Sequence, residues 1–304
     1  MMKSKEPKII LSASRRTDIP AFYGEWMRNR LRDGTVQIRN PFRTDRIREL
    51  RLSPDTVDAI VFWTKNPRPL MKFLPEIERM GYRYGFQFTL NAYDARLERN
   101  LPSEAERIRT FRELSSRIGR EKIIWRYDPI LFTPEIGVPE QLRSFRRLAE
   151  ALAPYTALCI ISYLDFYRKT KKNTAQIPCR EPEEEEIAQS AAGIVGTARE
   201  FGLELQSCCE ALELYGIRSG GCLHREFLEG IAGRELPAAK AKSQRAECRC
   251  AASVDIGAYE TCANGCLYCY ANASHENRDQ VLREHDPDSP LLNGHSIPGA
   301  GEAG

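Results

Sequence analysis

Histidine is scarce in this chain of 304 residues, and two familiar catalytic motifs are missing. The four histidines, His224, His275, His285 and His295, do not stand at metal-ligand spacing, so the sequence does not predict a zinc hydrolase. The chain contains no Gly-x-x-x-x-Gly-Lys-Ser/Thr and no Gly-x-Ser-x-Gly. P-loop nucleotide hydrolases and serine hydrolases of the α/β-hydrolase kind therefore lack their starting motif.

Long apolar runs are also absent, and the charges nearly balance. No run reaches the roughly 18 residues that a membrane span requires, and the basic start before Ser12 is too poor in apolar residues for a signal peptide. With 45 basic and 42 acidic residues, the net charge is only +3. Without a stripe of basic and aromatic residues, nucleic acid is not the expected ligand, although a local basic patch stays open. We expect a cytoplasmic protein with no membrane partner.

Cysteine is absent from the first half of the chain and frequent near its end. None occurs before Cys159, and eight of the ten lie from Cys208 to Cys269. In a reducing compartment, thiols serve as metal ligands or catalysts more often than as disulfides. The uneven distribution predicts a metal site built late in the sequence.

Short apolar runs rich in β-formers alternate with helical patterns, which predicts parallel strands joined by helices. Eight such strands close a barrel. We therefore predict an α/β fold, a (β/α)8-like TIM barrel, as a single domain over residues 1–273 with a weakly ordered tail over residues 274–304. The predicted strands are Lys8–Leu11, Thr35–Ile38, Asp58–Trp63, Tyr84–Leu90, Lys122–Tyr127, Ala157–Tyr163, Leu203–Ser207 and Val254–Tyr259.

Polar residues follow most of these strands, where barrel enzymes carry their chemistry. An arginine fork binds carboxylate or phosphate groups, and an aspartate can orient hydroxyls or those arginines. Capping of the following helices is the alternative use of any single one. The candidate catalytic residues are Arg15, Lys65, Arg126 and Asp128, and the candidate cofactor-binding residues are Ser12, Ser14, Arg16, Asn66 and Gln87.

The sharpest motif is a Cys-x3-Cys-x2-Cys loop formed by Cys262, Cys266 and Cys269. Three thiolates can ligate three irons of a [4Fe–4S] cubane and leave the fourth iron open to a non-protein ligand. A structural zinc site would instead need a fourth protein ligand and prefers paired Cys-x2-Cys knuckles. The spacing favours the iron–sulfur cluster, with zinc or a purely electron-transferring cluster as alternatives.

The stretch Gly-Cys-Leu-Tyr-Cys-Tyr-Ala within this loop resembles the signature of radical S-adenosylmethionine enzymes, close to their spore photoproduct lyase-like branch. The resemblance implies that S-adenosylmethionine binds the open iron and is cleaved to methionine and a 5′-deoxyadenosyl radical. It also implies that Tyr268 lies beside the adenine and that flavodoxin or ferredoxin donates the electron. Further stretches, LSASRRTDIPAFY, IRNPF, VFWTKNP, WRYDPI and SVDIGAYETCANGCLYCYAN, resemble a bacterial family known as domain of unknown function 1848, whose activity is unassigned.

The position of the loop departs from the radical enzymes, which carry it after the first strand. In a closed barrel the eighth strand neighbours the first, so a circularly permuted order would restore the arrangement. Val254–Tyr259 would then take the place of the first strand of that family, and Lys8–Leu11 that of the second. The stretch Ser12–Arg16 lacks the Gly-Gly-Glu-like motif that often follows the second strand in that superfamily.

A second group of cysteines surrounds the predicted seventh and eighth strands. Cys208, Cys222, Cys248 and Cys250 could close a second site, either an auxiliary iron–sulfur cluster or tetrahedral zinc. Free thiols remain the alternative. The competing hypothesis for the whole chain is a binding protein stabilised by zinc or an iron–sulfur cluster, without turnover and possibly for nucleic acid.

Overall fold

The computed structural model describes residues 8–237, 241, 248–272 and 278–293. Its main feature is an eight-stranded sheet in the order β10-β1-β4-β5-β6-β7-β8-β9, with every neighbouring pair parallel. The strands of this sheet are β1 (Ile9–Ala13), β4 (Val57–Thr64), β5 (Tyr84–Thr89), β6 (Ile123–Ile130), β7 (Leu158–Tyr163), β8 (Glu204–Cys208), β9 (Arg218–Gly220) and β10 (Val254–Asp255). The expectation of a mixed α/β fold around parallel strands is confirmed.

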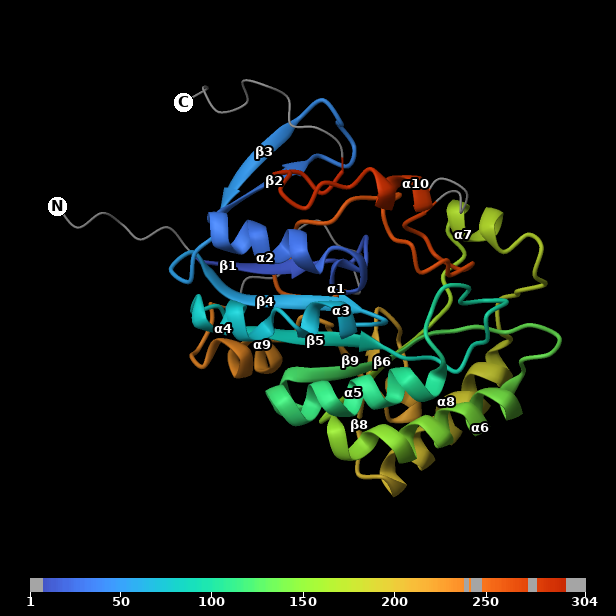
Figure 1. The fold of residues 1–304 in the computed structure, drawn as a ribbon. Helices are drawn as coiled ribbons and strands as arrows, with labels where there is room; N and C mark the ends of the chain where they lie inside the picture. Colours follow the sequence, from blue (N-terminus) through green and yellow to red (C-terminus); the bar gives the residue numbers. More distant parts are fainter. Residues whose placement is uncertain (1–7, 238–240, 242–247, 273–277, 294–304) are drawn as a thin grey trace.

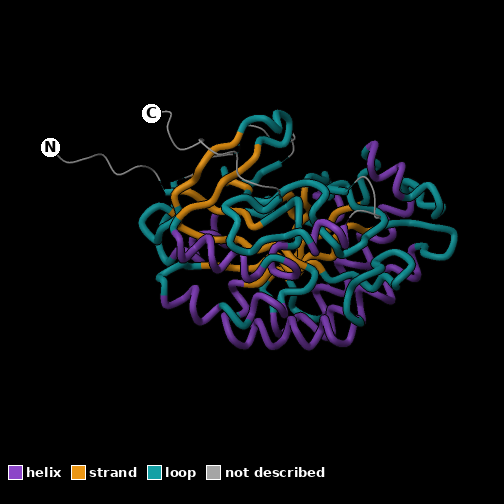
Figure 2. The backbone as a smooth tube through the Cα atoms, turned by 45° about the horizontal axis from the view of Figure 1, so that its top comes forward, coloured by secondary structure: helices purple, strands orange, loops and turns teal. Residues whose placement is uncertain are grey.

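Helices follow most strands, and most of them cover one face of the sheet (Figures 1 and 2). They are α1 (Ile19–Phe22), α2 (Gly24–Asp33), α3 (Arg68–Met71), α4 (Leu74–Arg79), α5 (Glu104–Ile118), α6 (Val138–Leu152), α7 (Arg168–Asn173), α8 (Glu184–Glu200), α9 (Arg225–Ala232) and α10 (Arg278–Arg283). Local sequence sets their starts, as in α5, where Ser103 and Glu106 form a reciprocal capping box. Within the described part of the chain, no helix is long and apolar enough to cross a membrane.

The two faces of the sheet carry different side chains because successive strand residues alternate. The outer face holds large apolar residues such as Phe62, Phe86 and Trp125, which pack against the helices. The inner face is apolar toward the amino ends of the strands, where α9 covers it, with Ile231 against Gly85. Toward the carboxyl ends the same face turns polar. This change of polarity along each strand places a polar layer at one end of the sheet.

Strand pairing settles one expectation and corrects another. β10 pairs in parallel with β1, with Leu11 opposite Val254, as the permuted order requires. The prediction that Thr35–Ile38 is a strand of the barrel is wrong: β2 (Thr35–Arg39) pairs antiparallel with β3 (Ile47–Arg51) in a separate two-stranded sheet. Alternation in that stretch reflects a half-buried ribbon, which periodicity cannot distinguish from a barrel strand. The eighth strand of the main sheet is β9.

The two edges of the sheet approach each other without forming a ladder between β9 and β10 among the described residues. The amide of Ala251 donates to the carbonyl of Leu223 over 2.9 Å, and a side chain on Gly221 would meet the backbone of Arg249. The segments next to β9 and β10 therefore touch, although a closed barrel is not formed by strand pairing.

Part of the expected weakly ordered tail lies against the body. Leu291 and Leu292 are buried, and the indole of Trp26 donates to the carbonyl of Ser289 over 2.8 Å. Residues 274–277 and 294–304 of that tail lie outside the described residues.

Candidate functional site

Asp255 joins the carboxyl ends of β10 and β1. Its carboxylate accepts hydrogen bonds from the hydroxyls of Ser12 (2.9 Å) and Ser14 (2.7 Å) and from the amide of Arg15 (2.9 Å). The guanidinium of Arg16 lies 3.9 Å from the same carboxylate. The predicted cofactor-binding segment after β1 is thus already bonded to a half-buried carboxylate of the protein itself, which fixes its shape.

Two guanidinium groups lie against one indole in the polar layer. Trp63, at the end of β4, has the guanidinium carbon of Arg15 at 4.8 Å from its ring centroid and that of Arg126 at 5.2 Å. The favourable interaction of a cation with an aromatic face offsets part of the cost of holding two like charges close together. Arg15 and Arg126, predicted independently as catalytic residues, therefore meet at one place.

Arg126 and Asp128 form a largely buried ion pair on β6. Asp128 also accepts a hydrogen bond from Ser162, and Arg126 contacts the sulfur of Cys222 at 2.7 Å. Burial opposes the charge on Arg126, but Asp128 and the nearby thiols of Cys222 and Cys208 raise its pKa well above the ordinary value. This guanidinium remains charged at any physiological pH.

Several buried polar atoms around this layer have no hydrogen-bond partner within the described structure. Gln87 donates from its side chain to the carbonyl of Cys222 over 2.6 Å, but its oxygen is unpaired. A buried polar atom without a partner costs on the order of 1–3 kcal/mol, so such atoms often mark places where water or a ligand binds. The unpaired atoms here are Arg15 Nη2, Trp63 Nε1, Gln87 Oε1 and Gln206 Oε1.

The cysteine loop lies over the same end of the sheet. The hydroxyl of Tyr270 donates to the carbonyl of Arg15 over 2.6 Å, and the hydroxyl of Tyr23 donates to the carbonyl of Thr261 over 2.7 Å. The loop therefore rests on the segments that follow β1. The arginines of the polar layer and the predicted cluster ligands belong to one region of the molecule.

The three thiols of the loop influence one another electrostatically. Burial raises the pKa of Cys262 to about 12, and Asp18 and Cys269 add to that shift. Burial also raises the pKa of Cys266 well above its usual range, against the opposing charge of Lys65, with Cys269 and Cys262 adding to the shift. Buried thiols without a compensating cation stay protonated, so a bound metal would provide the charge that these positions lack.

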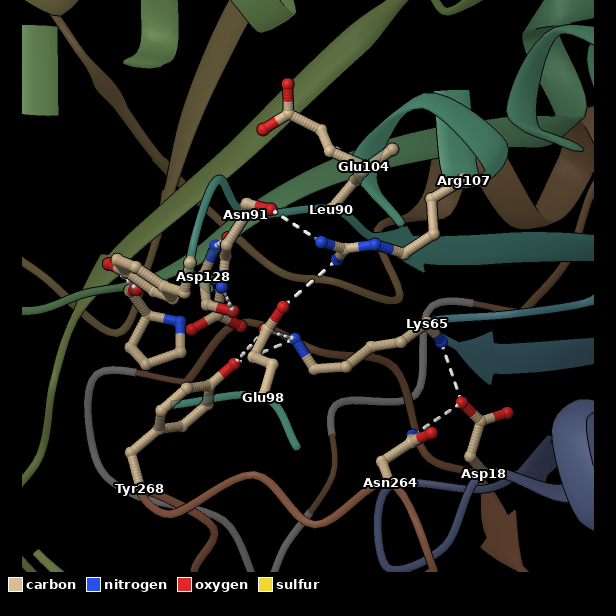
Figure 3. A network of polar contacts seen from close by, with 12 residues as sticks. Asp18, Lys65, Leu90, Asn91, Glu98, Glu104, Arg107, Asp128, Asn264 and Tyr268 are labelled. Carbon is tan, nitrogen blue, oxygen red and sulfur yellow. Dashed lines mark hydrogen bonds and ion pairs between the residues drawn. The ribbon is translucent and has the colours of Figure 1, made fainter. Parts of the chain in front are cut away.

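A buried ion network holds the loop to the body (Figure 3). Lys65 Nζ lies 2.7 Å from Glu98 and 2.9 Å from the hydroxyl of Tyr268, which itself donates to Glu98. Arg107 donates to the second oxygen of Glu98 over 3.0 Å. Tyr268 is therefore fixed by its hydroxyl, and Lys65 is committed to this network.

The backbone of Lys65 is held as firmly as its side chain. Its amide donates to Asp18 over 2.7 Å, and the same carboxylate oxygen accepts from the side chain of Asn264 over 2.9 Å (Figure 3). Asn66, predicted to bind cofactor, accepts from the amide of Arg68 at the start of α3 over 3.3 Å. Asn66 therefore bonds the backbone at the start of the next helix, although it is not the N-cap residue of α3.

The second cysteine group comes together on the inner face of the sheet. The sulfurs of Cys208 and Cys222 are 3.0 Å apart, Cys222 contacts Cys250, and Cys248 is buried in the same cluster. Within the residues that the structure describes, no group of three or more His, Cys, Asp or Glu side chains is arranged so that it could hold a metal ion. The case for either metal site therefore depends on the affinity of thiolates for metals and not on a preformed arrangement of the sulfurs.

A cavity of about 910 Å³ lies at the seam between the two edges of the sheet. Cys250, Leu223 and Ser253 line it, whereas Lys65 and Arg126 do not. The loop residues Cys262, Cys266 and Cys269 do not line it either.

Three of the residues that organise the site were not predicted. Glu98 stands in a charged loop without any periodic pattern, and Arg107 reads as part of the polar surface of a helix. Asp255 is a polar residue inside an apolar run, and that position was the only signal of its role.

Comparisons with known proteins give a family and little else. The family described as "Domain of unknown function (DUF1848)" matches residues 10–271. Among curated proteins, none matches the sequence. A crystal structure of a candidate alpha-L-fucosidase from Bacteroides thetaiotaomicron VPI-5482 aligns with 81% of this chain and 91% of its own at 9% identity, with a TM-score of 0.27. A likeness this weak carries no argument about fold or function.

Proposed function

The chain belongs to the DUF1848 family, and from that premise we propose that it is a [4Fe–4S]-dependent radical S-adenosylmethionine enzyme of the cytoplasm. The observation that carries the proposal is the position of the three-thiol loop, held over the carboxyl end of a parallel sheet beside β1. Chemistry in α/β folds of this kind belongs at that end. None of the ten cysteines, all of which lie in the described residues, forms a disulfide, which favours a reducing compartment.

Cys262, Cys266 and Cys269 would hold the cluster, and the loop offers one thiol fewer than the cube has irons. When bound, the cluster would supply the electron that cleaves S-adenosylmethionine to methionine and a 5′-deoxyadenosyl radical. Flavodoxin or ferredoxin is the class of donor that we expect. The parallel pairing of β10 with β1 supports the circularly permuted barrel that this assignment needs, with the seam closed by loops.

The residues of this chain divide into anchors and candidates for binding. Lys65 and Asp255 are bound by groups of the protein, so we assign them to positioning the loop and the end of β1. Arg15 keeps a buried nitrogen without a partner and lies against Trp63. We therefore infer that Arg15, with Arg126 on the same indole, binds an anionic group of the cofactor or substrate.

The second thiol group is a weaker proposal. Cys208, Cys222 and Cys250 would hold zinc or an auxiliary cluster, with Cys248 as the fourth donor. Metal analysis tests this second site. An auxiliary cluster would raise the iron content from about four to about eight per chain, and a zinc site would add one zinc to the four irons.

The test is anaerobic reconstitution followed by assay of 5′-deoxyadenosine from S-adenosylmethionine with dithionite. We expect a brown protein with about four irons or more per chain and turnover that Cys266→Ala abolishes. Cys159→Ala is the matched control, since this thiol is buried among the residues packed on the outer face of the sheet. Zinc without iron after reconstitution would establish the competing hypothesis of a metal-stabilised binding protein.

A further inference from the structure

The ribbon formed by β2 and β3 projects from the body of the molecule. Both views show it standing beyond the helices and the main sheet (Figures 1 and 2). Its root is anchored, because Val36 and Ile38 are buried and the amide of Gln37 donates to the carbonyl of Pro290 over 2.9 Å. Its far end, residues 40–46, is almost entirely exposed.

The charge of the chain is concentrated on this ribbon. Residues 35–51 contain five arginines and only two acidic residues, Asp45 and Glu49. Their net charge of +3 equals that of the whole chain, so the remaining residues are balanced. The nearly neutral net charge of the chain therefore conceals one basic element. This ribbon is the kind of local basic patch that the overall composition did not exclude.

Four of the five arginines are available to a partner. Within the described residues, no ion pair or hydrogen bond engages the guanidinium groups of Arg43, Arg46, Arg48 and Arg51, whereas that of Arg39 donates to the carbonyl of Thr44. Several surface arginines elsewhere pair with carboxylates, as on α6 and α8, where both terminal nitrogens of Arg146 bind Glu200. A guanidinium without a protein partner keeps its fork free for phosphate oxygens.

An aromatic side chain stands at the tip among these charges. Phe42 is 91% exposed, and the backbone around it has a defined shape. The side chain of Asn40 accepts from the amides of Phe42 (2.9 Å) and Arg43 (3.0 Å), and the amide of Asn40 donates to the carbonyl of Arg46 over 2.9 Å. The ring is thus presented to solvent by a turn that its neighbours hold in place.

We propose that the ribbon of residues 35–51 binds single-stranded nucleic acid, with Phe42 stacked on a base and the four arginines on the phosphate backbone. Aromatic stacking together with guanidinium contacts is how proteins bind unpaired strands without reading sequence. A base held in a duplex would not offer its face to Phe42, so the ring favours single strands. The proposal is independent of the cluster, because none of these residues touches the cysteine loop.

The experiment measures fluorescence anisotropy of labelled 20-nucleotide single strands, DNA and RNA in separate arms, with the full-length protein over a range of KCl concentrations. Phe42→Ala should weaken binding roughly tenfold, within the range measured for one stacked base. Replacing Arg43, Arg46 and Arg48 by Gln should lower the slope of log affinity against log salt by about 2, at about 0.7 per phosphate contact.

Matched controls separate this effect from charge and exposure alone. Leu214→Ala removes an equally exposed apolar side chain elsewhere. Replacing Arg143, Arg146 and Arg147 by Gln removes the same charge from the exposed face of α6. Both control proteins should bind as the wild type does.

Three results would overturn the proposal. The first is wild-type protein that binds neither single strand, and the second is equal loss of affinity in the ribbon and α6 variants. The third is tighter binding to duplex DNA, or to an acidic electron-transfer protein such as flavodoxin, than to the single strands. Cleavage of S-adenosylmethionine, measured on the same variants without nucleic acid, should be unchanged, so a failure here is distinguishable from a failure of the cluster assignment.

Discussion

Glu98 is the anion on which the buried network beside the cysteine loop depends. Its side chain is 1% exposed and faces two cations, Lys65 at 2.7 Å and Arg107 at 3.0 Å, which are themselves 13% and 3% exposed. Glu98→Gln keeps the volume but leaves both cations against a neutral amide. Breaking a buried pair from one side costs about 3–5 kcal/mol because an uncompensated charge stays buried.

Urea unfolding of the metal-free protein, followed by circular dichroism, measures this cost. The control is Glu113→Gln, which breaks the ion pair with Arg68, whose two side chains are each half exposed. An exposed pair contributes about 1 kcal/mol or less. Adding Lys65→Met to Glu98→Gln should recover part of the loss, because one unpaired cation is removed. Equal effects of Glu98→Gln and Glu113→Gln would refute the role given to the network.

Two further predictions test the packing of the sheet and of one tyrosine. Gly85→Ala should destabilise the fold by about 1–3 kcal/mol, because its new methyl would meet Ile231 at 2.5 Å. Gly196→Ala, with nothing within 4 Å of its new methyl, should instead stabilise α8 by roughly 0.5–1 kcal/mol. Equal denaturation midpoints of the two variants would contradict this. Burial raises the pKa of Tyr82 from 10.0 to about 12. The folded protein therefore holds this proton more tightly, so the associated stability is present below pH 10 and is lost as the pH rises toward 12. Tyr82→Phe should flatten the alkaline fall of the unfolding free energy between these pH values, and an unchanged slope would show that other groups cause it.

The sequence predicted the parts of the fold that carry strong apolar patterns. β4, β6 and β7 are rich in large apolar residues, and each is a mostly buried parallel strand. β9 escaped notice because Arg218–Gly220 is three residues long and contains no apolar side chain. The β2 strand was recognised as a strand but assigned to the wrong sheet, since pairing partners depend on tertiary contacts that alternation does not encode.

The site was predictable where a residue type has few other uses. The cysteine spacing, Arg15 and Arg126 were chosen for their chemistry, and the structure gathers them at one end of the sheet. Glu98 was not chosen, because an acidic residue in a charged loop is usually solvated. Its burial arises from contacts with α5 and with Tyr268, which is 170 residues away in the chain.

The pairing of β10 with β1 also determines when the molecule can be completed during synthesis. Some 240 residues separate the two strands, so a ribosome adding roughly 5–20 residues per second needs on the order of 10–50 s between them. During that time β1 has β4 on one side and an open hydrogen-bonding edge on the other. Exposed edges invite pairing with other chains, and during that time Asp18, Lys65 and Glu98 lack the contacts that Asn264 and Tyr268 of the cysteine loop provide. Insertion of the proposed cluster would therefore have to wait until Cys269 and the residues before it have been synthesised.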